Sequence, residues 1–513
     1  SNGITNEITI DEGGFLYVSS GGTATSTTVH SSGFIQVTKE GAANSTTVGV
    51  GGKMVVYSGG VANEAVVDST GELWVSGNGT ATSATVLAGG SLIACSSGVL
   101  NDAVVSSSGW MVVFSNGVAN STIIESDGDF AVRVGGTANY AVVNTSGHLE
   151  VSSGGEANSA TIEGGRLWVW SGGIANSAVV HSDGATIVKN LGTAFFTEVS
   201  SYGYMAVSSG GTAVSTTVCS LGLVYVSDGG KAISTFFSGS YIYPDFGADV
   251  ANARLYVFSG GEAQSTTVGD GGYIEVSSGG TADSIIVDHE GLLIIRSGGT
   301  GLNILENGGR VWIADDADVT FIPNVLSSIE WNHPGTLQCM ATLHSGTTAV
   351  SMLMDNGTGL DICKGGKAFD TTLKSYGHIV VSSGGTANDT AINNEAYMQV
   401  SSGGTASSVI ISSGGTLNIS QGGYVTGIEA HSGASLDLAI ASDTFVQGTV
   451  DGKAFAFSNY VSGFEAEVDL SIESGGTAVA TNVDGLYVGS GGTALSALVG
   501  TSSWGYMTVN NGG

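Results

Sequence analysis

The sequence predicts an all-β fold, a single-stranded right-handed parallel β-helix (β-solenoid) with about 19 residues per rung and three irregular interruptions. Three observations predict it. Glycines recur at two fixed phases, apolar residues alternate after the first glycine of each period, and the three prolines lie outside the regular pattern. The right-handed coil is expected because nearly all parallel crossovers have that hand.

Two series of glycines define the period. Successive members of each series are nineteen residues apart, except for a single step of eighteen. A fixed period of this length is typical of a chain that winds in equal coils, each buried against its neighbours. The first series is Gly14, Gly33, Gly52, Gly71, Gly90, Gly109, Gly128, Gly147, Gly165, Gly184, Gly203 and Gly222, and the second runs in parallel from Gly22 to Gly230.

Each period predicts two β-segments and two glycine corners. After Gly14, Leu16 and Val18 alternate with outward residues, as in a strand with one buried face. A Ser-Gly-Gly corner follows, where glycine tolerates positive φ. A second short segment then places Ala24 and Val29 inward. Like segments of successive coils are expected to pair in parallel ladders.

Interruptions of the period set the predicted organisation. Pro244, Pro323 and Pro334 all fall in irregular stretches, as expected because proline cannot donate to a ladder. Such insertions project as loops and often carry function. We predict regular rungs at 1–235, 254–309, 346–433 and 471–513, and irregular insertions at 236–253, 310–345 and 434–470.

Composition excludes several functions. Of 513 residues 83 are glycine and 42% are hydrophobic, so the chain is neither collagen-like nor disordered. The net charge is −31, with only 13 Lys and Arg residues spread along the chain. Nucleic acid and anionic lipid need clustered cations, so neither is an expected partner. No membrane span is apparent, and we expect this segment not to insert into a membrane.

Outward aromatic residues follow the first β-segment. The core of a coil does not need them, so they are a candidate contact face for protein or sugar. The alternative is that neighbouring rings only stabilise the sheet, and both interpretations can hold together. The candidate face comprises Phe15, Tyr17, Tyr57, Trp74, Trp110, Phe114, Trp168, Trp170, Tyr204 and Tyr225.

One corner position is nearly always asparagine, and Thr82 breaks the series. Stacked amides can hydrogen-bond along a column, so a structural asparagine ladder is expected. The alternative is a polar stripe that pairs with another copy. The residues are Asn44, Asn63, Asn101, Asn120, Asn139, Asn158 and Asn176.

Catalytic chemistry is not apparent, and we predict that the chain is not an enzyme, with no catalytic residues, metal or cofactor. Charged residues do not recur at fixed phases, and the histidines form no triad. The one dense titratable cluster is most simply a solvated acidic loop, although a carboxylate pair could serve glycoside hydrolysis or bind Ca²⁺. It consists of Asp315, Asp316, Asp318, Glu330 and His333.

Units such as VSSGGTATSTTVHSSG and YSGGVANEAVVDSTG resemble the imperfect nineteen-residue repeats of AIDA-type self-associating autotransporter adhesins. The resemblance implies a β-helical passenger on the bacterial cell surface or secreted, which promotes self-association, biofilm and attachment. Some family members carry sugars on Ser and Thr of their repeats. The outward serines that match are Ser26, Ser45, Ser83, Ser121, Ser159, Ser177 and Ser215.

The sequence therefore leaves two functional hypotheses. The first is a surface adhesin rod that binds other copies of itself laterally. Both chain ends share one phase of the period, so the chain is expected to be a piece of a longer array or to stack head to tail. The second is a glycan-binding or glycan-degrading module, with host or bacterial glycans as partners. Ice binding is weaker, because Ala65 and Val66 replace the threonines of other coils.

Overall fold

A computed structural model describes residues 3–30, 32–238, 253–269, 271–329, 340–462, 468–479, 481–499 and 506–510. All regular secondary structure in these residues is β, and the coils stack in parallel, so the predicted β-solenoid is confirmed. Its hand remains a prediction. The chain divides into two compact units: Ser1–Ile285 with Ile294–Gly301 and Ile313–Asp318, and Ile286–Leu293 with Leu302–Trp312 and Val319–Gly513.

A coil of the first unit has three β-segments, whereas the sequence predicts two. In one coil these are β6 (Phe34–Val37), β7 (Ala42–Asn44) and β8 (Thr47–Val48). The predicted second segment is divided at Ser45, which has a φ of 50°. A left-handed residue turns the chain, so β7 and β8 belong to different faces of the coil.

The left-handed corner was missed because it is rarely glycine. It recurs once per coil, most often as serine. The conformation costs about 1–2 kcal/mol for a residue with a Cβ. A hydrogen bond between coils offsets part of that cost: the Ser45 amide donates to the Asn63 carbonyl at 2.9 Å, and the Ser121 amide donates to the Asn139 carbonyl at 2.8 Å.

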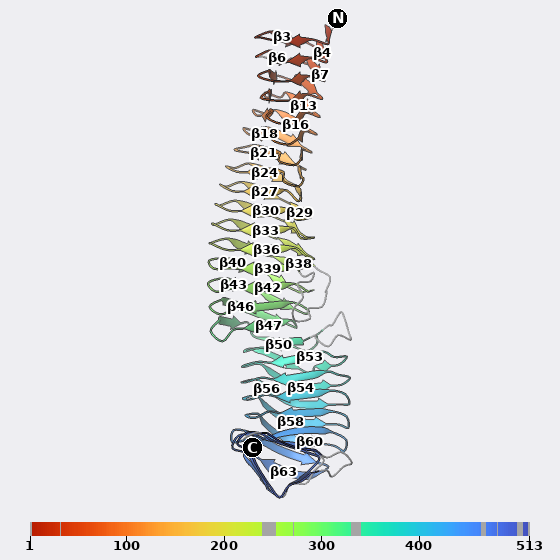
Figure 1. The fold of residues 1–513 in the computed structure, drawn as a ribbon, viewed down its shortest axis with the longest axis vertical. Helices are drawn as coiled ribbons and strands as arrows, with labels where there is room; N and C mark the ends of the chain where they lie inside the picture. The colour runs from red at the N-terminus through yellow and green to blue at the C-terminus, as the bar shows by residue number, and fades with distance from the viewer. Residues whose placement is uncertain are drawn as a thin grey trace. The chain divides into compact units, whose positions relative to one another are not determined.

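The first segments of successive coils form a parallel sheet, which we call the front sheet (Figure 1). Each strand pairs with its neighbour one period later, for example Ile35 with Met54. Its strands in the first unit are β3 (Phe15–Val18), β6, β9 (Lys53–Val56), β12 (Glu72–Val75), β15 (Ser91–Ala94), β18 (Trp110–Val113), β21 (Asp129–Val132), β24 (His148–Val151), β27 (Arg166–Val169), β30 (Ala185–Val188), β33 (Tyr204–Val207), β36 (Leu223–Val226), β39 (Arg254–Val257) and β42 (Tyr273–Val276).

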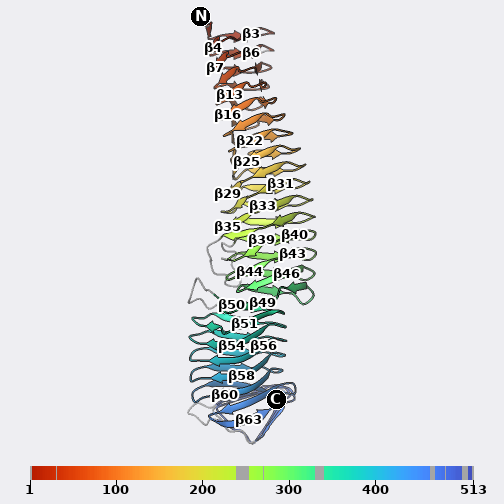
Figure 2. The ribbon, with the colours of Figure 1, turned by 180° about the vertical axis from the view of Figure 1, so that it is seen from behind.

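The other segments stack in the same way behind the front sheet (Figure 2). Alternate residues of all the segments point into a continuous apolar core. Ile35, Val37, Ala43 and Val48 have no exposed surface, as the alternating pattern predicts. The strands used below are β16 (Val99–Asn101), β19 (Val118–Asn120), β22 (Thr137–Asn139), β25 (Glu156–Asn158), β28 (Ile174–Asn176) and β31 (Thr193–Phe195).

Close backbone approach explains much of the glycine period. A Cβ on Gly60 would lie 2.5 Å from the Val37 carbonyl oxygen of the preceding coil, and one on Gly52 would lie 2.4 Å from the Val29 oxygen. Gly59 is different, because it takes a φ of 76° with open space around it. The corners therefore need glycine mainly for space between coils and only in part for positive φ.

In the second unit, a single longer strand replaces the two short segments. The long strands are β54 (Lys367–Leu373), β56 (Thr386–Ile392), β58 (Thr405–Ile411) and β60 (Tyr424–Ala430). They remain in parallel register, and the left-handed residue persists inside them, as at Asp370. The facing strands are β53 (Gly359–Ile362), β55 (His378–Val381), β57 (Tyr397–Val400), β59 (Thr416–Ile419) and β61 (Ser435–Ile440).

The predicted insertions contain more strand than expected. Within 310–345, β49 (Asn324–Leu326) pairs in parallel with β51 (Thr347–Val350), and β50 (Met340–Leu343) pairs with β53. Within 434–470, β62 (Phe445–Val450) and β63 (Lys453–Phe457) form an antiparallel hairpin. The sequence missed these strands because they lack paired glycine corners. Most of 236–253 lies outside the described residues.

A buried carboxylate marks the change of pattern in the second unit. Glu306 has no exposed surface and pairs with Val287 of the coil before it, where an apolar side chain is usual. Its carboxylate accepts hydrogen bonds from the Thr342 hydroxyl at 2.8 Å and the His344 amide at 2.7 Å, and it lies 2.7 Å from the His344 ring. These contacts satisfy a group that would otherwise destabilise the core.

Candidate functional site

The aromatic residues singled out from the sequence lie on the outer surface of the front sheet, in three columns instead of one stripe. Strand register places Phe15, Trp110 and Tyr204 in the first column, and Tyr17, Trp74, Trp168 and Tyr225 in the middle column. The third column follows the strand ends and contains Tyr57, Phe114 and Trp170. We call this surface the front face.

Some of these rings support the sheet. Ile93, Val112 and Ala131 are buried on the front face, and Trp74 and Phe114 pack against this small cluster. The Trp74 indole also donates a 2.8 Å hydrogen bond to Glu72. That bond, followed by the Lys53 ammonium, lowers the pKa of the Glu72 carboxyl. Stabilisation of the sheet is therefore enough to explain the presence of Trp74 and Phe114.

Another set of rings forms a continuous series of contacts along the coils. We call Tyr204, Tyr225, Tyr256 and Tyr273 the tyrosine ladder. Ring centroids of successive members are 6.5, 5.6 and 5.9 Å apart, and Phe258 stacks on both Tyr225 and Tyr256. Burial raises the pKa of the Tyr225 and Tyr273 phenols. Tyr225 and Tyr256 stack face to face, whereas Tyr204 meets Tyr225 edge-on and Tyr273 is tilted against Tyr256.

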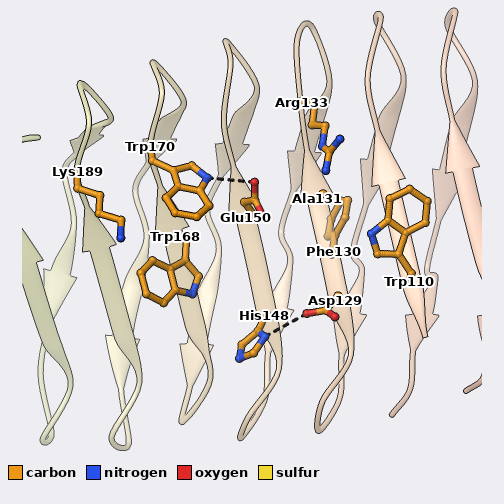
Figure 3. Close-up of a pocket in the computed structure, with 10 residues that line it drawn as sticks. All are labelled: Trp110, Asp129, Phe130, Ala131, Arg133, His148, Glu150, Trp168, Trp170 and Lys189. Atoms are coloured by element: carbon orange, nitrogen blue, oxygen red, sulfur yellow. Dashed lines mark hydrogen bonds and ion pairs between the residues drawn. The ribbon is translucent and has the colours of Figure 1, made fainter. Parts of the chain in front are cut away.

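A third region of the front face is hollow. We call it the tryptophan hollow, an open depression of about 350 Å³ (Figure 3). Ala131 leaves space in the middle column, between Val112 and Glu150 of the adjoining coils. The lining residues are Trp110, Asp129, Phe130, Ala131, Arg133, His148, Glu150, Trp168, Trp170 and Lys189.

The rings at one end of the hollow are held by polar contacts. The Trp170 indole donates a 3.1 Å hydrogen bond to Glu150. The Lys189 ammonium lies 4.8 Å from the centre of the Trp168 ring and 5.0 Å from that of Trp170. Figure 3 shows Trp110 on the opposite side of the hollow. Trp168 and Trp170 are therefore held in place by the protein itself.

The hollow also contains a mixed set of charges. The His148 ring nitrogen lies 3.1 Å from the Asp129 carboxylate, and the exposed Arg133 lies near the coil corner. Sequence reasoning named the three tryptophans but missed Ala131, Asp129, His148, Glu150 and Lys189. These residues could have been found from the period, because residues nineteen positions apart in the sequence become neighbours on adjacent coils.

The predicted asparagine column is joined by side-chain hydrogen bonds. Asn120, Asn139, Asn158 and Asn176 each donate to the amide oxygen of the asparagine one coil earlier, at 2.8 to 3.0 Å, beginning with Asn101. Asn63 donates to Asn44 at 2.8 Å, and Thr82 separates this pair from the longer run. These amides are engaged with one another.

The outward serines occupy the left-handed corner. Ser26, Ser45, Ser121, Ser159 and Ser177 are all exposed with positive φ. The following inward position is buried, as at Thr27 and Thr46. The serine hydroxyls therefore project from a regular edge, away from the core.

The acidic cluster is only partly described. Asp315 and Asp316 follow β47 (Arg310–Ile313) of the front sheet, and Asp318 begins β48 (Asp318–Phe321). The Ser297 hydroxyl donates to Asp316 at 2.8 Å. Glu330 and His333 lie outside the described residues. Within the part of the chain that the structure describes, no group of three potential ligands could hold a metal ion. No helix among those residues is long and apolar enough to cross a membrane.

Comparison with known proteins gives two findings. Residues 124–184 match a family model described as the adhesin of the bacterial autotransporter system, probable stalk. A solved structure of a TibC-catalysed, hyper-glycosylated fragment of TibA is 32% identical in sequence, covering 62% of this chain and 99% of that one, with a TM-score of 0.42. A search of curated proteins gave no match.

Proposed function

The chain belongs to the AIDA-type autotransporter adhesins and is a surface adhesin; we propose that it serves as a stalk that contacts other copies of itself side by side. The family places such a chain on the bacterial surface or in secreted material, and it favours a structural role over catalysis. Lateral contact needs a surface that recurs at equal spacing in both partners.

In-register stacking is the observation that supports lateral contact. Every coil of the first unit repeats the position of the one before it, with parallel strands about 4.8 Å apart. Two copies laid side by side therefore share one spacing, and a weak contact made by one coil can be repeated by the next. Repetition raises the overall affinity far above that of one contact.

The front face is the surface proposed to make that contact. It exposes large apolar side chains, including 59% of Phe15, 48% of Tyr17 and 37% of Trp110. Exposed aromatic residues dominate the energetics of many protein interfaces. The net charge of −31 opposes association and is screened by salt. We therefore expect association to strengthen as ionic strength rises.

Sedimentation velocity at low and high ionic strength tests self-association. The expected result is a monomer in low salt and dimers or larger species in high salt. Trp110→Glu should weaken association, and the first column accepts this side chain because Glu72 occupies it naturally. Ser121→Glu is a matched control, since it adds the same charge at the corner where Glu64 occurs. A monomer under all conditions would contradict the proposal.

Glycosylation at the left-handed corner is a second part of this proposal. The TibA fragment is hyper-glycosylated by TibC, and the corner serines of this chain are exposed at regular intervals. We propose Ser26, Ser45, Ser121, Ser159 and Ser177 as acceptor sites. Peptide mass spectrometry after treatment with TibC and its sugar donor should find sugar on these serines and none on buried Thr27 and Thr46. Modification confined to other positions would contradict the assignment.

A further inference from the structure

We propose that the tryptophan hollow is a binding site for a short, uncharged oligosaccharide that lies along the stack of coils. This inference does not depend on self-association, because it assigns a ligand to a single copy of the chain. It rests on the shape of the hollow, the chemistry of its lining and the way its aromatic rings are held.

The shape suits an extended ligand with rings. Trp110 and Trp168 lie on strands separated by three steps of the front sheet, which is about 14 Å at the usual strand spacing. Between them the small Ala131 side chain, itself buried, lies at the base of the depression, which is open to solvent. Such a trough accommodates a chain of sugar rings better than a compact apolar molecule, which binds in enclosed pockets.

The lining offers the two kinds of contact that sugars need. Indole faces can pack against the C–H surfaces of pyranose rings, and tryptophan brings a large apolar area for that purpose. Asp129 and Glu150 accept hydrogen bonds, Arg133 donates them, and His148 can do either. Hydroxyl groups both donate and accept, so an oligosaccharide can satisfy all of these groups.

The charges favour a neutral ligand. Two carboxylates, Asp129 and Glu150, lie in the same hollow as the cations of Arg133 and Lys189. A phosphate polymer needs clustered positive charge without nearby carboxylates. A cationic ligand would in turn meet Arg133 and Lys189. An uncharged glycan avoids both penalties.

The site is organised before binding. Glu150 holds the Trp170 indole, Lys189 lies over the rings of both Trp168 and Trp170, and Asp129 holds His148. Groups that are already ordered lose less conformational entropy when a ligand binds. In the tyrosine ladder, by contrast, the rings contact one another.

A glycan array followed by calorimetry of the best ligand tests the proposal. The purified chain should bind neutral oligosaccharides, and Ala131→Trp should weaken binding by about tenfold or more because it fills the hollow. That variant should fold, since Trp74 and Trp168 occupy the same column. Trp110→Ala should also weaken binding, with circular dichroism confirming the β-structure of each variant.

Tyr17→Ala is the matched control, because Tyr17 is an exposed ring of the middle column outside the hollow. It should leave glycan affinity unchanged. A blank array, equal binding by Ala131→Trp, or a preference for acidic polymers that high salt abolishes would each overturn the proposal. Sedimentation of the same samples without sugar reports self-association separately, so failure of one proposal is distinguishable from failure of the other.

Discussion

The front face has two neighbouring stretches with the same backbone and different side-chain use. From Trp110 to Lys189 the aromatic rings surround a hollow, whereas from Tyr204 to Tyr273 each ring contacts the next. The difference depends on neighbours one coil away. Ala131 leaves space beside the tryptophans, while successive tyrosines fill the space beside each other. Whether outward rings border an open space or pack against one another therefore depends on the residues one coil away.

The two stretches also differ on the sheet behind the front face. The asparagine ladder from Asn101 to Asn176 runs along the coils of the hollow and ends where Phe195 pairs with Asn176. The next coils carry Val214 and Ile233 at that position. Each stretch thus has one ladder of side chains that links its coils. In the hollow stretch this ladder lies away from the front face, where separate contacts such as His148 with Asp129 and Trp170 with Glu150 also link neighbouring coils.

The largest expected effect tests whether the two stretches share one backbone. A Cβ at Gly136, beside the hollow, or at Gly211, beside the tyrosine ladder, would lie 2.3 Å from a carbonyl oxygen of the preceding coil. Gly136→Ala and Gly211→Ala should each lower the free energy of local opening by about 3 kcal/mol. Hydrogen exchange of the adjoining strands measures this change.

The control for these variants is Gly154→Ala, which has positive φ but no atom within 4 Å of the added Cβ. It should cost about 1–2 kcal/mol, the strain of the left-handed conformation alone. Unequal effects at Gly136 and Gly211 would mean that the two stretches differ in their backbone as well as in their side chains.

The second-largest expected effect distinguishes a ring of the tyrosine ladder, which contacts other rings, from a ring at the edge of the hollow. Tyr256→Ala removes contacts with Tyr225, Phe258 and Tyr273 and should reduce the free energy of local opening by about 2 kcal/mol. Trp110→Ala should cost less than about 1 kcal/mol, because that ring is partly exposed at the edge of the hollow. Hydrogen exchange compares the two variants, and a larger loss for Trp110→Ala would contradict the distinction.

As the pH is raised, the coils of the tyrosine ladder should lose stability before those of the hollow. Burial raises the pKa of Tyr225 and, together with a hydrogen bond to Glu275, that of Tyr273. In the unfolded chain these phenols lose their protons near pH 10. The folded state then binds more protons than the unfolded state, so stability falls as pH rises above about 10.

Tyrosinate absorbance and tryptophan fluorescence, followed during an alkaline titration, measure this order. The double variant Tyr225→Phe and Tyr273→Phe should move the loss of structure to higher pH, whereas Tyr17→Phe should not. A change in tryptophan emission that precedes ionisation of the ladder would show that the hollow coils open first.

The smallest expected effect concerns the asparagine ladder. Asn139 donates to Asn120 and accepts from Asn158, so Asn139→Ala removes two side-chain hydrogen bonds. Asn63→Ala removes one, to Asn44. We expect losses in thermal stability corresponding to about 2 and about 1 kcal/mol, respectively. Equal losses would contradict this expectation, because they would mean that the second hydrogen bond of Asn139 adds no stability.

The sequence predicted the period and the inward residues because both depend on spacing alone. Val37 and Val48, for example, are fully buried as the alternation requires. It missed the third corner because Ser45 and its equivalents adopt a glycine-like conformation without being glycine. It could not predict the hollow because that depends on the size of Ala131 relative to its neighbours in the coils before and after. It also could not tell that Tyr225 belongs to the tyrosine ladder and Trp168 to the hollow, because both occupy the same column.

Hydroxyl-radical footprinting tests most directly whether copies of the chain meet through the front face. Side-chain oxidation would be compared by mass spectrometry at low salt and at the high salt that promotes association. The account predicts protection of Phe15, Tyr17 and Trp110, with Tyr140 and Phe196 on the left-handed corner remaining reactive. Protection of Tyr140 and Phe196 while Phe15, Tyr17 and Trp110 stay reactive would contradict it.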